Sequence, residues 1–139
     1  MECQPVIIID THVWIWAVNK NFRLGRSSRS FLESVDEIGV SAITPWEIAL
    51  LARKDRLGFG VDIFHWIKRA LSDPKVRLLP LDPLIAVEST RLPAYPSGDP
   101  ADRILIATAQ YLNVPLMTAD HVILAYGARG EVQVIDAEK

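Results

Sequence analysis

The sequence has few residues that form disulfides or soft-metal sites. It contains one cysteine, Cys3, and three widely separated histidines, His12, His65 and His121. A single cysteine excludes an internal disulfide and suits a reducing compartment such as the cytoplasm. The histidine spacing does not match a zinc site. Long apolar runs are also missing, since Val6–Ile9 has four residues and a membrane helix needs about 20. We therefore expect a cytoplasmic protein without a membrane span.

Net charge is modest but unevenly distributed. The 139 residues carry a formal net charge of −2, so bulk charge does not indicate nucleic-acid binding. Residues 20–77 nevertheless hold eleven basic and seven acidic side chains, a net of +4, and the rest of the chain is −6. This basic half is a candidate contact surface for a polyanion. On charge alone, solvent-exposed helix faces are the favoured explanation.

Short apolar segments predict buried parallel strands. Four of them lack polar alternation, as expected of strands covered on both faces: PVIIID from Pro5, EIGVSAI from Glu37, VPLMTAD from Val114 and VQVID from Val132. VRLLPL from Val76 is a weaker fifth candidate, because Pro80 favours an edge strand or a strand end.

Helical patterns lie between the predicted strands. They are RSSRSFLES, TPWEIALLARKD, VDIFHWIKRAL, PLIAVESTRL and DPADRILIATAQYL. The alternation predicts a single α/β domain over residues 1–139, with a mainly parallel central sheet flanked by helices in three layers. The four tryptophans are expected in the core or at an oligomer interface rather than stacked on bases.

Acidic residues occupy the junctions between these elements. They are Asp10 after the first strand, Glu47 in the first turn after VSAI, Asp99 and Asp102 at the start of an apolar helix, and Asp120 after PLMTA. The carboxyl ends of parallel strands meet at one sheet edge, where ligands usually bind. We therefore expect these acids to share one crevice. Carboxylates this close together stay ionised only if cations compensate their charge. Oxygen ligands without histidine or cysteine favour Mg²⁺ or Mn²⁺, and such a site activates water for phosphodiester hydrolysis.

Each acid taken alone also fits a helix cap. Thr44 and Glu47 match a capping box, and Asp99 matches an N-cap before a first-turn proline. Asp10 and Asp120 fit simple caps. Capping does not explain why all these junctions fall on one sheet edge, so the sequence favours a shared site.

Other polar residues have expected supporting roles. Thr11 and Thr118 place hydroxyls near the crevice, to support an activated water or to make turn hydrogen bonds. Arg103 follows Asp102 and is expected to pair with a carboxylate, reach a phosphate or form a surface salt bridge. Asp82 is expected to be a plain helix cap, because its strand is the doubtful one.

Four segments occur in an informative order, IIIDTHVWIWAV, SAITPWEIA, GDPADRILIATA and LMTAD. Together they resemble the PIN-domain family, in particular the VapC-type toxins of bacterial toxin–antitoxin pairs. The resemblance implies a PIN-like fold and a metal-dependent endoribonuclease. It also implies a homodimer and a small antitoxin protein that inserts a segment into the site and blocks it.

The family's acids match residues of this chain. Asp10, Glu47, Asp102 and Asp120 would be catalytic and surround Mg²⁺ or Mn²⁺, with Asp99 as an additional acid. We expect Asp10, Asp102 and Asp120 to hold the metal, and Glu47 and Asp99 to bind it directly or through water. Metal-activated water would then hydrolyse the RNA backbone.

Two other functions stay open at this point. One is a non-catalytic PIN-like module that binds RNA or a protein, which an incomplete acid set would favour. The other is an α/β phosphatase or phosphotransfer protein with Asp10 as nucleophile. That chemistry usually places an acid two residues later, where this chain has His12, and a lysine near the later acids, where none lies between Lys75 and Lys139.

Overall fold

A computed structural model describes residues 5–54 and 62–139. The described residues form one sheet of five strands in the order β3-β2-β1-β4-β5, and every neighbouring pair is parallel. The strands are β1 (Ile7–Ile9), β2 (Ile38–Ser41), β3 (Val76–Leu79), β4 (Leu116–Thr118) and β5 (Val134–Asp136). The four predicted strands and the weaker fifth are confirmed. β3 lies at the sheet edge, where Pro80 placed it.

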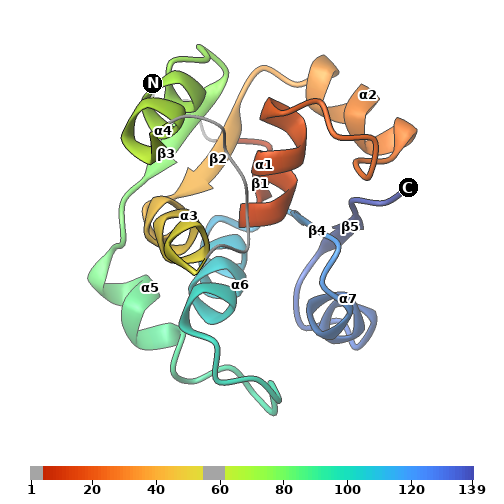
Figure 1. The fold of residues 1–139 in the computed structure, drawn as a ribbon. Coiled ribbons are helices and arrows are strands. Elements are labelled where there is room, and N and C mark those ends of the chain that lie inside the picture. Colours follow the sequence, from red (N-terminus) through yellow and green to blue (C-terminus); the bar gives the residue numbers. More distant parts are fainter. Residues whose placement is uncertain (1–4, 55–61) are drawn as a thin grey trace.

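Helices connect the strands and cover the sheet (Figure 1). They are α1 (Thr11–Val18), α2 (Arg26–Ser34), α3 (Ile43–Arg53), α4 (Ile63–Leu71), α5 (Pro83–Glu88), α6 (Pro100–Leu112) and α7 (His121–Ala128). All predicted helices are present. α2 has the predicted bounds, and the others differ by a few residues at one or both ends. Cys3, the end of the helix predicted through Asp55 and the start of the one predicted from Val61 lie outside the described residues. Within the described part of the chain, no helix is long and apolar enough to cross a membrane.

Two apolar clusters lie on opposite faces of the sheet, because alternate side chains of a strand point in opposite directions. Ile7 and Ile9 of β1 belong to a cluster with residues of α1, α2 and α4. Ile8 belongs to the other cluster, with residues of α6 and α7. The predicted three-layer α/β architecture is therefore confirmed.

The topology brings distant segments to one edge of the sheet. The central strand β1 has β2 on one side and β4 on the other, and ligands usually bind at such a switch point. α1, α3 and α7 follow β1, β2 and β4, and so begin at the carboxyl edge. α6 leads into β4 from the opposite direction, so its first turn reaches the same edge.

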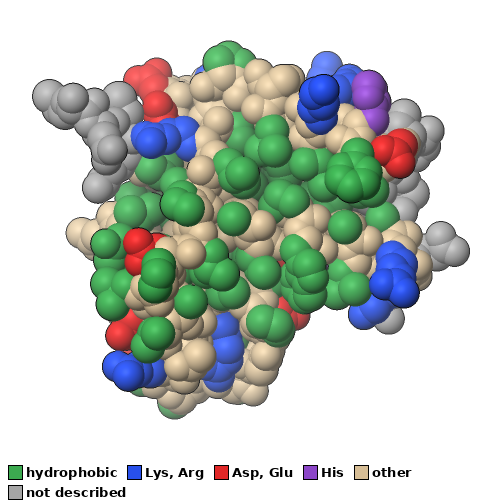
Figure 2. All heavy atoms as spheres, turned by 90° about the vertical axis from the view of Figure 1, so that its left-hand side faces the viewer, with side chains coloured by type: hydrophobic (Ala, Val, Ile, Leu, Met, Phe, Trp, Pro, Cys, Tyr) green, Lys and Arg blue, Asp and Glu red, His purple; other side chains and the backbone are tan. Residues whose placement is uncertain are grey.

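One side of the molecule keeps a large apolar surface. Figure 2 shows hydrophobic side chains gathered on the side that carries β3 and α5. Four of the side chains in this region, which we call the apolar face, are 44–50% exposed: Leu78, Leu81, Leu84 and Val87. Contiguous exposed apolar surface of this kind is typical of interaction sites.

Candidate active site

A cleft of about 390 Å³ opens at the carboxyl edge of the central strands. All five acids predicted from the sequence line it: Asp10, Glu47, Asp99, Asp102 and Asp120. They come from four segments of the chain that the topology brings together. α3, which carries Glu47, packs against both α1 and α6, so the cleft has walls on several sides.

Asp10 is the most deeply buried of the five acids, at 7% exposure. It caps α1, and its Oδ1 accepts a 2.9 Å hydrogen bond from the backbone N–H of Val13. Its Oδ2 accepts a 2.5 Å hydrogen bond from Oγ1 of Thr118, at the end of β4. The same hydroxyl oxygen accepts from the backbone N–H of Asp120 at 3.0 Å. Thr118 therefore holds two of the acids relative to each other.

Asp99 and Asp102 share the start of α6. Asp99 is the N-cap, and its Oδ1 accepts from the backbone N–H of Asp102 at 3.1 Å. The reciprocal bond of a capping box is absent from these described residues, because the N–H of Asp99 donates to Oγ of Ser97 instead. The carboxylate of Asp102 is therefore not used in capping and remains available at the cleft.

The capping box predicted for Thr44 and Glu47 is wrong. α3 begins at Ile43, whose backbone N–H donates to Oγ of Ser41 at 3.1 Å. Thr44 lies inside the helix, and its buried hydroxyl has no hydrogen-bond partner among the described residues. Glu47 is consequently two residues further into the helix than expected. Its Oε1 accepts a hydrogen bond from Oγ1 of Thr11, which fixes the carboxylate against α1.

The cleft has an excess of negative charge. Burial and, after it, the nearby carboxylates, with Asp99 first among them, together raise the pKa of Asp102 to about 8. Burial likewise raises the pKa of Asp10 to about 6, against the opposing effect of its hydrogen bond from Thr118. Carboxyl groups that hold protons near neutral pH indicate that the described residues do not neutralise this cluster by themselves.

Arg103 has different partners from those expected. Its guanidinium donates to three backbone carbonyls, those of Ser97 at 2.7 Å and of Ser89 and Tyr95 at 3.1 Å each. It also lies over the Tyr95 ring, 5.5 Å from its centroid. Within the described residues it forms neither a salt bridge nor a carboxylate contact. Arg103 therefore supports the loop that leads into Asp99.

Asp82 caps α5 through a 2.8 Å hydrogen bond from Leu84 N–H, as predicted. The sequence did not predict a role in the site for the other wall of the cleft, which contains His12, Trp16 and Arg23. Arg23 was only one of eleven basic residues in its half of the chain. Its position depends on the path of the loop between α1 and α2, for which no local motif exists.

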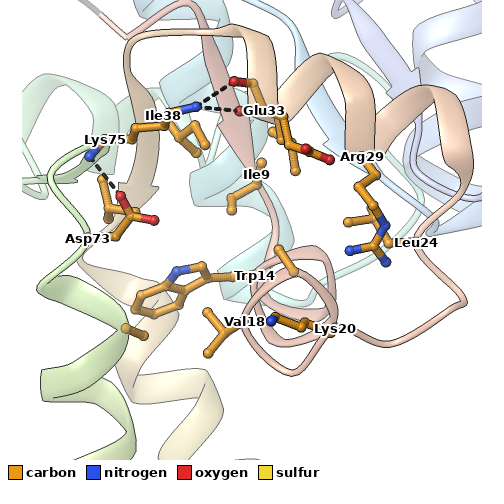
Figure 3. A pocket seen from close by; sticks show the side chains of 14 residues that line it. Ile9, Trp14, Val18, Lys20, Leu24, Arg29, Glu33, Ile38, Asp73 and Lys75 are labelled. Carbon is orange, nitrogen blue, oxygen red and sulfur yellow. Dashed lines mark hydrogen bonds between the residues drawn. The ribbon is translucent and has the colours of Figure 1, made fainter.

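A second and larger cavity of about 620 Å³ lies against the other side of α1 (Figure 3). Its charged groups are mostly engaged locally. Nζ of Lys75 donates to the carbonyls of Leu32 and Glu33, and Oδ1 of Asp73 accepts from Lys75 N–H. This cavity contains no cluster of carboxylates, so we assign the candidate chemistry to the smaller acidic cleft.

The donor set of the cleft fits a hard divalent cation, because carboxylate oxygens are the ligands that Mg²⁺ and Mn²⁺ prefer. The raised pKa values of Asp10 and Asp102 also favour a cation, because they show that the ionised carboxylates lack a compensating positive charge. Among the described residues, however, no three His, Cys, Asp or Glu side chains already form a group that could hold a metal ion. A bound cation would therefore have to draw these carboxylates closer together.

Comparisons with known proteins agree with this geometry. A sequence model of the PIN domain matches residues 7–128. The chain is 32% identical over 117 residues to Ribonuclease VapC22 of Mycobacterium tuberculosis, a match that covers 84% of this chain and 88% of that protein.

Solved structures share the fold. A structure of FitAB bound to an IR36 DNA fragment is similar with a TM-score of 0.67 at 22% identity, over 96% of both chains. A toxin-antitoxin complex from Klebsiella pneumoniae is similar with a TM-score of 0.64 at 22% identity, over 94% of this chain and 97% of that one. At such identities the structural likeness shows the fold alone.

Proposed function

The chain belongs to the PIN-domain family, and on that basis we propose that it is an endoribonuclease that hydrolyses RNA phosphodiester bonds with the help of Mg²⁺ or Mn²⁺. The observation that carries this proposal is the convergence of five carboxylates in one cleft. The similarity to a protein named a ribonuclease supports RNA as the substrate. The complete acid set favours an enzyme over a non-catalytic binding module.

In this proposal Asp10, Asp102 and Asp120 hold the cation, and Glu47 and Asp99 bind it directly or through water. A bound divalent cation lowers the pKa of water and offsets the negative charge that develops on the phosphate. The raised pKa values of Asp10 and Asp102 support their assignment, because a cation would replace the protons that these groups otherwise retain.

Two threonines orient the acids of the site. Thr118 donates to Oδ2 of Asp10, whose Oδ1 accepts from the backbone N–H of Val13. The carboxylate is thus held from two sides, and each oxygen keeps a lone pair for a cation. Thr11 donates to Oε1 of Glu47 and leaves Oε2 available. Hydroxyls placed behind acidic ligands in this way fix carboxylate rotamers, and such supporting bonds matter for metal sites.

The direct test is cleavage of a labelled RNA pool by purified protein, with Mg²⁺, with Mn²⁺ or with excess chelator. We expect cleavage only with a divalent cation, and none by Asp102→Asn. Asp82→Asn is the matched control, because Asp82 is a helix cap outside the cleft. Cleavage that persists in chelator or in Asp102→Asn would refute the proposal.

We also propose that the chain is the toxin of a toxin–antitoxin pair, and that a small antitoxin protein blocks the acidic cleft. The fold shared with a toxin-antitoxin complex supports this. Co-purification with the product of a small neighbouring reading frame, and loss of RNA cleavage in that complex, would be expected. If that product neither binds nor inhibits, it is not the antitoxin, and growth that is unaffected by the chain alone would contradict the toxin role.

A homodimer completes the proposal. The apolar face exposes about half of the Leu84 and Val87 side chains, which lie three residues apart on one side of α5. A second copy of the chain would bury these groups and make an apolar interface core, which is typical of homodimers.

A further inference from the structure

The acidic cleft has one cationic wall. Arg23 is the one lysine or arginine among the cleft-lining residues in the described part of the chain, and it faces a cluster of five acids. His12 and Trp16 belong to the same wall. This asymmetry separates an acidic side, which suits a cation, from a basic side, which suits an anion.

Arg23 is held in place by an aromatic ring. Its guanidinium carbon lies 4.5 Å from the centroid of the Trp16 ring, a cation–π arrangement. The His12 ring lies on the same side of α1, with its centroid 6.3 Å from that of Trp16. Trp16 is only 5% exposed, and the guanidinium of Arg23, whose side chain is 55% exposed, packs over its ring.

The backbone of the loop that carries Arg23 is also fixed. Oδ1 of Asn21 accepts from the N–H of Arg23 at 2.9 Å, and the N–H of Asn21 donates to the Trp16 carbonyl at 2.9 Å. Nη2 of Arg29 donates to the carbonyl of Asn21 at 3.0 Å. These bonds tie the loop to both α1 and α2, so the arginine extends from a rigid support.

The existing ion pair of Arg23 is weak. Its Nη2 lies 3.6 Å from Oε2 of Glu138, and the two side chains are 55% and 43% exposed. Exposed pairs of this kind contribute little and are screened by salt. A phosphate oxygen can therefore replace this carboxylate at small cost, and a guanidinium binds phosphate through two parallel hydrogen bonds.

An RNA strand has to approach a cluster of carboxylates that repels it. A divalent cation would offset this repulsion only at the phosphate that is cut. The neighbouring phosphates need a separate cation, and Arg23 supplies one at the rim of the same cleft. We propose that Arg23, supported by Trp16, binds a phosphate next to the scissile one and so directs the strand across the loop between α1 and α2. This inference rests on the proposed ribonuclease function.

The test measures binding separately from cleavage. In an Asp102→Asn background with Mg²⁺, a labelled pool of short single-stranded RNAs of random sequence is titrated over a range of salt concentrations. Adding Arg23→Gln is expected to weaken binding about tenfold at low salt. It should also reduce the slope of log affinity against log salt by about 0.7, the loss of one single-strand phosphate contact. In the active protein, the same change should raise KM far more than it lowers kcat.

Arg129→Gln is the matched control. Arg129 also lies over an aromatic ring, that of Tyr126 at 5.5 Å, but it is outside the cleft lining. Glu138→Gln is a second probe, expected to tighten binding about twofold while Arg23 is present and to have no effect in Arg23→Gln. The inference would be overturned if Arg23→Gln and Arg129→Gln lost RNA affinity equally. It would also be overturned if Arg23→Gln left the slope of log affinity against log salt unchanged. Failure of the proposed ribonuclease function would give a different result. The wild type would then not cleave RNA, but RNA binding would still depend on Arg23.

Discussion

Thr118 donates a 2.5 Å hydrogen bond from its Oγ1 to Oδ2 of Asp10 and thereby joins the ends of β4 and β1. Both side chains are buried, so the bond is shielded from water. It opposes the rise in the pKa of Asp10 that burial causes. The hydroxyl thus keeps a buried carboxylate oriented and closer to its ionised state.

Thr118→Val removes this hydroxyl with little change in shape. The buried oxygen of Asp10 would lose its partner, so we expect the free energy of unfolding to fall by about 1–2 kcal/mol. RNA cleavage should fall by about 10- to 100-fold, as is typical when a group that supports a metal ligand is lost. Urea denaturation and initial cleavage rates measure the two effects.

Thr108→Val is the control for that substitution. Thr108 is equally buried, but its Oγ1 donates to the Ile104 carbonyl within α6. This variant should keep wild-type cleavage whatever its stability. If Thr118→Val is as active as Thr108→Val, Thr118 does not orient the site.

Stability in excess chelator should fall as pH rises. The pKa values of Asp102 and Asp10 are about 8 and about 6 in the folded chain, against an ordinary value of 3.8. Between pH 3.8 and about pH 8 the folded state binds more protons than the unfolded state, so raising the pH favours unfolding. Asp102→Asn should flatten this dependence and be more stable than the wild type at about pH 8, by about 2 kcal/mol. Urea denaturation across this pH range tests both statements, and a wild type that gains stability toward alkaline pH would contradict them.

A divalent cation should reverse that alkaline loss. Ligands that bind only the folded state raise the melting temperature with concentration. At about pH 8 we expect Mg²⁺ or Mn²⁺ to raise the Tm of the wild type by several degrees, and to have little effect on Asp102→Asn. Differential scanning fluorimetry measures the shift, and K⁺ at matched ionic strength is the control. Equal shifts in the two proteins would show that the acidic cleft is not the binding site.

Arg103→Met should be strongly destabilising. The substitution leaves three backbone carbonyls without their charged donor, which we expect to cost about 3 kcal/mol. Cleavage should fall even at temperatures where the protein stays folded, because the supported loop carries Asp99. Arg91→Met, at an exposed pair with Glu88, should change stability by less than about 0.5 kcal/mol. Thermal melts and cleavage rates compare the two, and similar effects would refute the loop-supporting role.

Leu84→Lys should separate the proposed homodimer. A charge at the centre of the apolar face would have to be buried against the second copy, and that is costly. Light scattering after gel filtration should report a dimer for the wild type and a monomer for the variant. Val122→Lys places the same charge on α7, at a residue that is 40% exposed against 50% for Leu84, and should stay dimeric. A monomeric wild type would rule out the interface.

Much of this architecture could be predicted from local sequence. Apolar segments without alternation identified four strands. VRLLPL was a weaker fifth candidate, for which Pro80 favoured an edge strand or a strand end, and β3 does lie at the edge. Asp10, Asp99 and Asp120 do cap helices, and they also line the common cleft. The two interpretations of these acids are therefore compatible. Asp99 and Asp120 cap through Oδ1 alone. Both oxygens of Asp10 accept a hydrogen bond, but each keeps a second lone pair.

One error is local and the others arose where tertiary structure sets a contact. The capping box at Thr44 failed because α3 begins at Ile43, whose backbone N–H donates to Oγ of Ser41. Arg103 is adjacent to Asp102 in sequence, but neighbours on a helix point about 100° apart, so its guanidinium reaches a distant loop. Arg23 was not predicted because no local sequence motif indicates that the loop between α1 and α2 passes beside the cleft.

Three helices begin on acids of the cleft, at Asp10, Asp99 and Asp120. Asparagine caps helices as well as aspartate does, and a single nucleotide change converts one into the other. Each of these positions can therefore lose its charge while the helix start survives. For a gene whose proposed product harms its own cell, such mutations offer a short route to an inactive protein. The inactive protein would still fold.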